Sequence, residues 1–172
     1  LIVMEQRQLF ETHAKAQGLA DAKISWLQLA SGAPMNDALL SGNLEIAAGG
    51  QGPFITIWAR TKGNLNVKGL AAINSMPLYL NTINPNVKTI KDFTEKDRIA
   101  LPAVKVSIQA VTLQMAAEKA FGEGQQGKLD ALTVSLSHPD AQVALLSGAS
   151  EITAHFGSPP FQFQQLEKPG IR

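Results

Sequence analysis

Polar side chains and glycines that could hold a small ligand occur at four places along the chain, each near the end of a predicted strand and before a helix. In open α/β sheets, ligands bind where parallel strands end and where helix N-termini present backbone N–H groups without partners. Such amides suit an oxyanion or a small polar molecule, and side-chain donors beside them add specific hydrogen bonds. The predicted ligand-binding residues are Ser31, Gly32, Gly50, Gln51, Lys105, Ser107, His155 and Ser158.

Each of these places also has a structural interpretation that the sequence leaves open. The segment 49–52 lacks the GxGxxG spacing of a dinucleotide site, so it could be a tight turn between a strand and a helix. Lys105 could be a solvated lysine near a helix start, and Ser107 could be the N-cap of that helix. His155 lies where a predicted strand ends, and a packed histidine is an equal alternative there.

Residues that would carry catalysis or bind a metal are sparse. No GxSxG, P-loop or SxxK motif occurs, and the chain has no cysteine. His13, His138 and His155 are far apart in the sequence and form no HxxH or HExxH pair, so a zinc site is not expected. The sequence therefore predicts no catalytic residue, no metal and no cofactor.

The composition excludes two further classes of function. With 15 basic and 14 acidic side chains, the 172 residues have a net charge of +1, and no region has the basic excess of a nucleic-acid-binding surface. No run of about 18 apolar residues occurs, so no membrane span is expected. The hydrophobic fraction of 45% is sufficient for the core of one domain or of two small lobes.

The elements that would position these residues alternate between strands and helices, which is typical of an α/β fold with a largely parallel sheet. Short apolar runs bounded by turn residues predict strands over 23–29, 44–48, 64–73, 78–82 and 98–101. Helices are predicted over 5–17, from the turn at 31–34 to about residue 40, over 54–62, and from 102–109 to about residue 122. The first helical pattern has no cap residue, so we expect the numbering to open inside a helix, with any signal peptide or first strand upstream.

An internal repeat with an offset of 106 residues indicates two related lobes. The sequence ALLSG occurs at 38–42 and again at 144–148, and the Glu-Ile pair at 45–46 recurs in the same register at 151–152. Ser31 is equivalent to Ser137, and each follows a predicted strand and precedes a helix. A period of this length favours a duplicated lobe over a solenoid of short repeats.

Three segments together carry a family pattern. Residues 29–54 read LASGAPMNDALLSGNLEIAAGGQGPF, which is similar to GxxxxxALxxGxxDxxxxGxxP. Residues 87–101 are similar to IKTVADLKGKKVA, and residues 136–148 end in the second ALLSG. Over nearly all of residues 5–172, the chain resembles the periplasmic substrate-binding components of ABC importers, in the family for alkanesulfonates, taurine, nitrate, bicarbonate or thiamine-precursor pyrimidines.

The resemblance implies a type II periplasmic-binding-protein fold, in which two α/β lobes close on one small molecule about extended hinge segments. Residues 1–80 would form an incomplete first lobe and residues 81–172 the second lobe, with the hinge near 78–83. The family's ligand residues would lie in the four loops described above. This chain departs from the family at 103–108, where relatives have a Gly-Ser-rich turn, and at 157–159, where many have an acidic residue.

The resemblance also implies a function. The protein would be an extracytoplasmic receptor that captures a small anionic or polar organic nutrient and delivers it to an ABC permease in the membrane. It would be a monomer, either periplasmic or lipid-anchored outside the cytoplasmic membrane. Two alternatives stay open: an enzyme on the same scaffold, acting on small acids or pyrimidines, and the ligand-sensing domain of a regulator. The absence of cysteine argues against the iron-using, cysteine-bearing synthases of that scaffold.

Overall fold

The computed structural model describes residues 1–148 and 151–172, and its sheet is built from the C-terminal half of the chain. The strands are β1 (Leu80–Thr82), β2 (Ile99–Leu101), β3 (Thr133–Ser135) and β4 (Ala154–Phe156), in the order β1-β4-β2-β3. Strand β2 is parallel to β3 and to β4, whereas β1 is antiparallel to β4. The three parallel strands therefore end at one edge of the sheet, and each leads into the helix that follows it.

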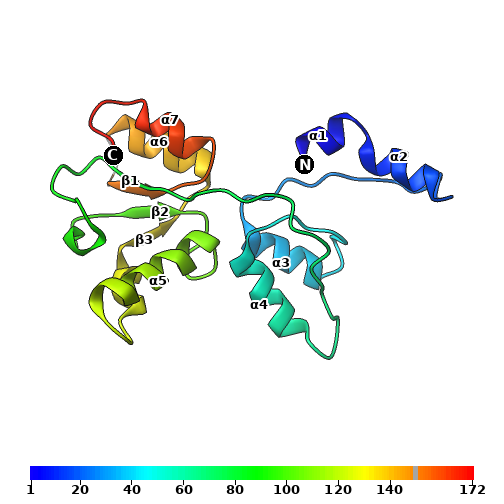
Figure 1. Ribbon diagram of the computed structural model, residues 1–172, viewed down its shortest axis with the longest axis horizontal. Coiled ribbons are helices and arrows are strands. Elements are labelled where there is room, and N and C mark those ends of the chain that lie inside the picture. Colours follow the sequence, from blue (N-terminus) through cyan, green and yellow to red (C-terminus); the bar gives the residue numbers. More distant parts are fainter. Residues whose placement is uncertain (149–150) are drawn as a thin grey trace.

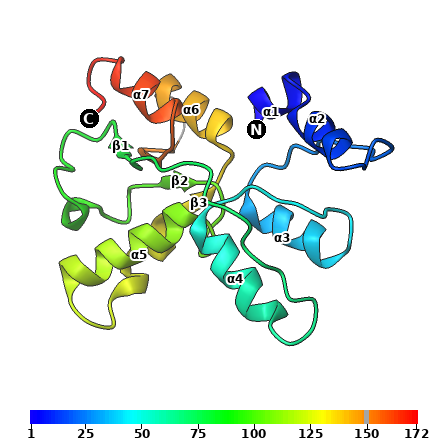
Figure 2. The same cartoon turned by 45° about the vertical axis from the view of Figure 1, so that its right-hand side comes forward.

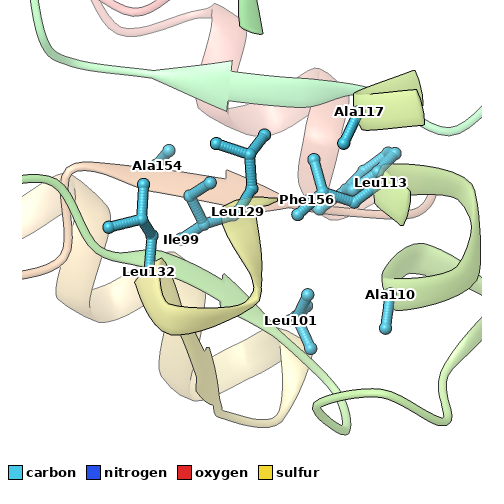
Figure 3. Close-up of a cluster of buried hydrophobic side chains, with 9 residues drawn as sticks. All are labelled: Ile99, Leu101, Ala110, Leu113, Ala117, Leu129, Leu132, Ala154 and Phe156. Carbon is cyan, nitrogen blue, oxygen red and sulfur yellow. The ribbon is translucent and has the colours of Figure 1, made fainter. Parts of the chain in front are cut away.

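Helices cover both faces of this sheet (Figure 1). Helix α5 (Ile108–Phe121) and the 3-10 helix η2 (Gln126–Leu132) pack on one face, and α6 (His138–Ser147) and α7 (Phe161–Leu166) lie on the other. Successive side chains of a strand point to opposite faces, and β2 follows this rule. Its Ile99 and Leu101 join the core under α5, shown in Figure 3, while Ala100 joins the core under α6.

The N-terminal part of the chain consists of helices joined by irregular segments. These helices are α1 (Ile2–Gln6), α2 (Leu9–Ala16), α3 (Gly32–Leu40) and α4 (Gln51–Thr61). Helices α3 and α4 pack together, and the side-chain amide of Asn36 donates a hydrogen bond to the carbonyl oxygen of Pro53 at 2.9 Å. In the part of the chain that the structure describes, no helix combines the length and the apolarity that crossing a membrane requires.

Three of the predicted strands, over 23–29, 44–48 and 64–73, are wrong, since none of these segments is a strand. A strand needs a neighbour for its backbone hydrogen bonds, and within residues 1–148 and 151–172 no backbone hydrogen bond joins 23–29 or 44–48 to another segment. Ile24, Leu27 and Ile46 in these segments are accordingly exposed. The helix predicted over 5–17 is interrupted at Gln8, whose φ of 48° lies in the left-handed region.

The remaining predicted elements are present, although α4 begins at Gln51 and not at the predicted residue 54. Strands β1 and β2 lie within the predicted ranges 78–82 and 98–101, and α5 ends at Gly122 as expected. The repeat is visible in the helices: α3 ends near Gly42 and α6 near Gly148, with φ values of 74° and 62°. Glycine adopts this left-handed conformation without a steric penalty, so the two ALLSG motifs are two equivalent helix ends.

Candidate ligand-binding site

The first turns of α3, α4 and α5 lie against one another where the two parts of the chain meet (Figure 2). A Cβ atom added at Gly32, the first residue of α3, would lie 2.3 Å from Cγ of Pro53 in α4. A Cβ atom added at Gly50, the N-cap of α4, would lie 3.1 Å from Cβ of Ile108 in α5. Glycine at these two positions therefore permits the close approach of three helix N-termini.

The first turn of α6 lies next to the first turn of α5. The side-chain nitrogen of Gln109 in α5 lies 3.3 Å from Nε2 of His138, the first residue of α6. The ring of His138 in turn stacks on Phe161, the first residue of α7, with centroids 5.8 Å apart. We call the first turns of α3, α4, α5 and α6, residues 32–34, 51–53, 108–110 and 138–140, the N-terminal cluster.

The helices of this cluster differ in whether the side chain of the N-cap residue accepts a hydrogen bond from their first backbone N–H groups. The first amides of any helix have no acceptor within that helix. In α5 and α6, Ser107 and Ser137 act as N-caps, since their Oγ atoms accept from backbone N–H groups of the first turn at 3.2 and 3.3 Å. Neither Ser31 nor Gly50 provides a side-chain cap for α3 or α4. The first-turn amides of α3 and α4 are therefore the ones most suited to bind an oxyanion.

Five of the eight predicted ligand residues begin helices of this cluster. Ser31 and Gly32 begin α3, Gly50 and Gln51 begin α4, and Ser107 begins α5. Ser107 is only 4% exposed and caps its helix, which is the structural role that the sequence left open. Contact between these residues and a ligand stays a prediction.

The other three predicted residues lie elsewhere. Lys105 is exposed in the loop between β2 and α5, with a left-handed φ of 63°. Ser158 is partly buried in the loop between β4 and α7, where its carbonyl oxygen accepts from the backbone of Gln162 at 3.2 Å. His155 lies within β4 with no exposed surface, and its Nε2 is 2.9 Å from Nδ1 of His138. The structure thus places His155 behind His138, as a packed histidine.

Sequence reasoning missed His138 as a candidate ligand residue. The repeat contained the signal, because an offset of 106 residues that equates Ser137 with Ser31 also equates His138 with the predicted ligand residue Gly32. No group of three histidine, cysteine or acidic side chains within residues 1–148 and 151–172 is arranged to hold a metal ion. A pocket of about 300 Å³ beside β1 and Arg172 is lined by none of the eight predicted residues.

Both histidines of this pair are neutral near pH 7. Burial, and then the proximity of His138, lowers the pKa of His155 to about 4, although the hydrogen bond between His155 and Gln165 opposes this shift. Burial also lowers the pKa of His138 below its ordinary value. An imidazole without charge donates through one ring nitrogen and accepts through the other, so this pair offers directed hydrogen bonds and no positive charge.

Acidification from pH 6.5 to about 4 is expected to destabilise the fold. In this range the unfolded chain binds a proton at His155 that the folded chain excludes, so the free energy of unfolding decreases as the pH falls, by up to about 1.4 kcal/mol per pH unit. Urea unfolding at a series of pH values measures the slope. The variant His155→Gln should make the slope shallower, and the lowered pKa of His138 should account for part of the slope that remains. A wild-type stability independent of pH in this range contradicts the prediction.

Two solved structures share the fold of this chain. The periplasmic aliphatic sulphonate binding protein SsuA from Escherichia coli matches 99% of this chain and 54% of its own, with a TM-score of 0.62 and 22% identity. The alkanesulfonate-binding protein SsuA from Xanthomonas axonopodis pv. citri, bound to MOPS, matches the same shares of the two chains with a TM-score of 0.70 and 19% identity. No family model matches the sequence, and a search of curated proteins finds no match.

These matches confirm the predicted fold class. The chain has the α/β fold of a periplasmic binding protein, and it spans 54% of the length of each solved chain that it matches. At 19 and 22% identity the likeness establishes the fold alone. Function therefore has to be argued from the N-terminal cluster and the residues around it.

Proposed function

We propose that the protein is an extracytoplasmic solute-binding receptor of an ABC importer that captures a small anionic or polar organic nutrient of the sulfonate, nitrate or pyrimidine class. The observation that carries this proposal is the N-terminal cluster, in which the first turn of α4 contacts α3 in the N-terminal part and α5 in the C-terminal part, and α5 in turn contacts α6. Uncapped helix N-termini bind anions through their amides and dipoles. With a net charge of only +1, the attraction for an anion must come from such local donors.

The proposal includes a movement of two lobes. Residues 1–80 would form part of the first lobe and 81–172 the second, with a hinge near 78–83. The chain runs between the two parts as an extended segment that enters β1 at Leu80 (Figure 1). Rotation about this segment would open and close the N-terminal cluster around the ligand, as in other hinge-closing binding proteins.

The partners and location follow from the same proposal. A receptor of this kind would work as a monomer in the periplasm, or attached to a lipid outside the cytoplasmic membrane, and would hand its ligand to the permease of the importer. Both solved structures that share the fold are binding proteins, and their names refer to sulfonates. This supports the sulfonate class as the first ligands to test.

Isothermal titration of the protein with ethanesulfonate, nitrate and an aminopyrimidine tests the proposal. We expect one of the three to bind with a stoichiometry of about one ligand per chain, because one N-terminal cluster is present. Mass analysis of the ligand after incubation separates the alternatives, since a receptor returns it unaltered and an enzyme converts it. Absence of binding by all three ligands would contradict the proposed ligand classes.

A further inference from the structure

The extended segment that joins the two parts of the chain contains a stretch with no hydrogen bonds, residues 70–76 (Figure 1). All residues of this stretch are exposed, Leu70 and Ile73 by 80% and 63%. Within residues 1–148 and 151–172, none of their backbone or side-chain groups has a hydrogen-bond partner. The stretch can therefore bend without breaking a hydrogen bond to either part of the chain.

The residues that follow this stretch are attached to the C-terminal part. The side chain of Leu78 packs, partly buried, against the core under α5. The N–H of Gly157, the residue after β4, donates to the carbonyl oxygen of Tyr79 at 2.9 Å. Residues 80–82 form β1, which pairs with β4. A rotation that keeps these contacts leaves residues 78–82 with the C-terminal part.

The attachment begins at one buried side chain, that of Gln162 in α7, which has no exposed surface. Its Nε2 donates to the carbonyl oxygen of Pro77 at 3.0 Å, and its Oε1 accepts from the backbone N–H of Tyr79 at 3.1 Å. A backbone carbonyl oxygen only accepts and a backbone N–H only donates, so both bonds require this one orientation of the amide. We call these two hydrogen bonds the amide clamp.

Neighbouring residues hold Gln162 in place for the amide clamp. Nδ2 of Asn81, a side chain that is 2% exposed, donates to the backbone carbonyl oxygen of Gln162 at 2.8 Å. The ring of Phe163 meets the ring of Tyr79 edge to face, with centroids 5.4 Å apart. A Cβ atom added at Gly157 would lie 3.3 Å from Cβ of Gln162, so glycine there permits the close approach of α7. The side-chain amide is thus fixed before it meets the connecting segment.

We propose that Gln162 is a positioning residue for lobe closure: its amide clamp fixes Pro77 and Tyr79 to the C-terminal part and confines the rotation to residues 70–76. The inference rests on the proposed function, since it concerns the lobe movement proposed there, and it places the bending part of the hinge just before residues 78–83. A short hinge limits the orientations of the open protein. Fewer orientations are then lost when the N-terminal cluster closes on a ligand, which favours binding.

Hydrogen exchange of backbone amides, followed by NMR without a ligand, tests the amide clamp. The acceptor of the Tyr79 N–H is Oε1 of Gln162, so in the wild type this amide should be protected about tenfold or more relative to the amides of 70–76. Gln162→Met keeps the length of the side chain and removes both bonds, so this protection should be lost. Gln162→Glu keeps an oxygen for the Tyr79 N–H and should retain it.

The matched control is Gln164→Met, the same substitution at an exposed glutamine of the same helix. It should leave the exchange of Tyr79 unchanged, and thermal unfolding shows which variants fold. Absence of protection at Tyr79 in the wild type overturns the inference, as does full protection in a folded Gln162→Met protein. If Gln162→Met does not fold, the wild type and Gln162→Glu decide, and loss of protection in a folded Gln162→Glu protein overturns the inference.

The confinement of the rotation is measured by the distance between two spin labels, again without a ligand. The chain has no cysteine, so Asp37→Cys in α3 and Lys119→Cys in α5 provide two unique, exposed attachment points. Loss of the amide clamp extends the free stretch from 70–76 to about 70–79, and the reach of a free chain grows as the square root of its length, so the distance distribution should be broader by about a fifth in Gln162→Met. Equal widths in Gln162→Met and the wild type overturn the confinement.

The affinity for ethanesulfonate separates the inference from the proposed function. Gln162→Met should bind this probe about threefold more weakly or worse, because its hinge has more freedom to lose, whereas Gln164→Met should bind it as the wild type does. Equal affinities of Gln162→Met and the wild type overturn the role of the amide clamp in closure. Failure of the wild type to bind ethanesulfonate contradicts the sulfonate form of the proposed function, and the exchange rates and label distances then uphold or overturn the amide clamp by themselves.

Discussion

Replacement of Gly32 by alanine is expected to weaken the binding of ethanesulfonate by about tenfold or more. The added Cβ atom would lie 2.3 Å from Cγ and 2.6 Å from Cβ of Pro53, whose ring cannot rotate away. Helix α3 would have to shift against α4, so its uncapped first turn would leave the N-terminal cluster. Overpacking of this kind lowers the free energy of unfolding by about 1–3 kcal/mol. The affinity falls for a separate reason, the displacement of the first-turn amides of α3, and a tenfold loss corresponds to about 1.4 kcal/mol of binding free energy.

The matched control for this substitution is Gly49→Ala. The nearest heavy atom to a Cβ added at Gly49 is Sδ of Met35 at 3.9 Å, an ordinary van der Waals distance. Gly49→Ala should therefore bind ethanesulfonate as the wild type does. Calorimetry gives the affinities, and circular dichroism shows whether the helices persist. A folded Gly32→Ala protein with unchanged affinity would show that the position of α3 does not matter for binding.

Sequence reasoning located the elements of the C-terminal part because their signals are local. Ser107 caps α5 and Gly122 ends it, and both residue types have these preferences in any sequence. The short apolar run at 98–101 became β2, which has a parallel neighbour on each side. An element could be predicted where its local sequence pattern was present and the fold also supplied the neighbouring segments with which it pairs.

The missing strands at 23–29 and 44–48 show the opposite case. Both runs have the apolar content of strands, but strand formation depends on a neighbouring segment, and a local pattern does not reveal whether one is present. The fold class could still be predicted, because it rests on the alternation of elements and on the motifs of the resemblance.

The buried hydrogen bonds that join Asn81, Gln165, His155 and His138 could not be predicted from the sequence. Asn81, His155 and Gln165 belong to β1, β4 and α7, and their bonds depend on how two strands and a helix are packed. His155 stood out in the sequence as a residue at a strand end, whereas the structure buries it and brings His138 to the helix start. Only the repeat, by equating position 138 with position 32, connected His138 to the site.

Replacement of Leu113 by alanine is expected to lower the free energy of unfolding by about 2–5 kcal/mol. Leu113 lies on α5 with 1% exposure and belongs to the core that contains Leu101 and Phe156 (Figure 3). Truncation loses the transfer free energy of the removed atoms and leaves a cavity that the strands cannot fully close. Urea unfolding monitored by circular dichroism measures the change.

Met115 on the same helix provides the matched control for Leu113. It is 67% exposed, so Met115→Ala should change the free energy of unfolding by less than about 0.5 kcal/mol. The core under α5 contains residues of β2 and β4, and β4 carries His155, so loss of this core should also disrupt the hydrogen bonds of His155. In Leu113→Ala, the NMR signals of the His155 ring in the folded state should therefore disappear at a lower urea concentration than in the wild type, together with the helical signal. Equal destabilisation by both substitutions would contradict the assignment of Leu113 to the core. Early loss of the His155 signals alone would show that its hydrogen bonds are held independently of this core.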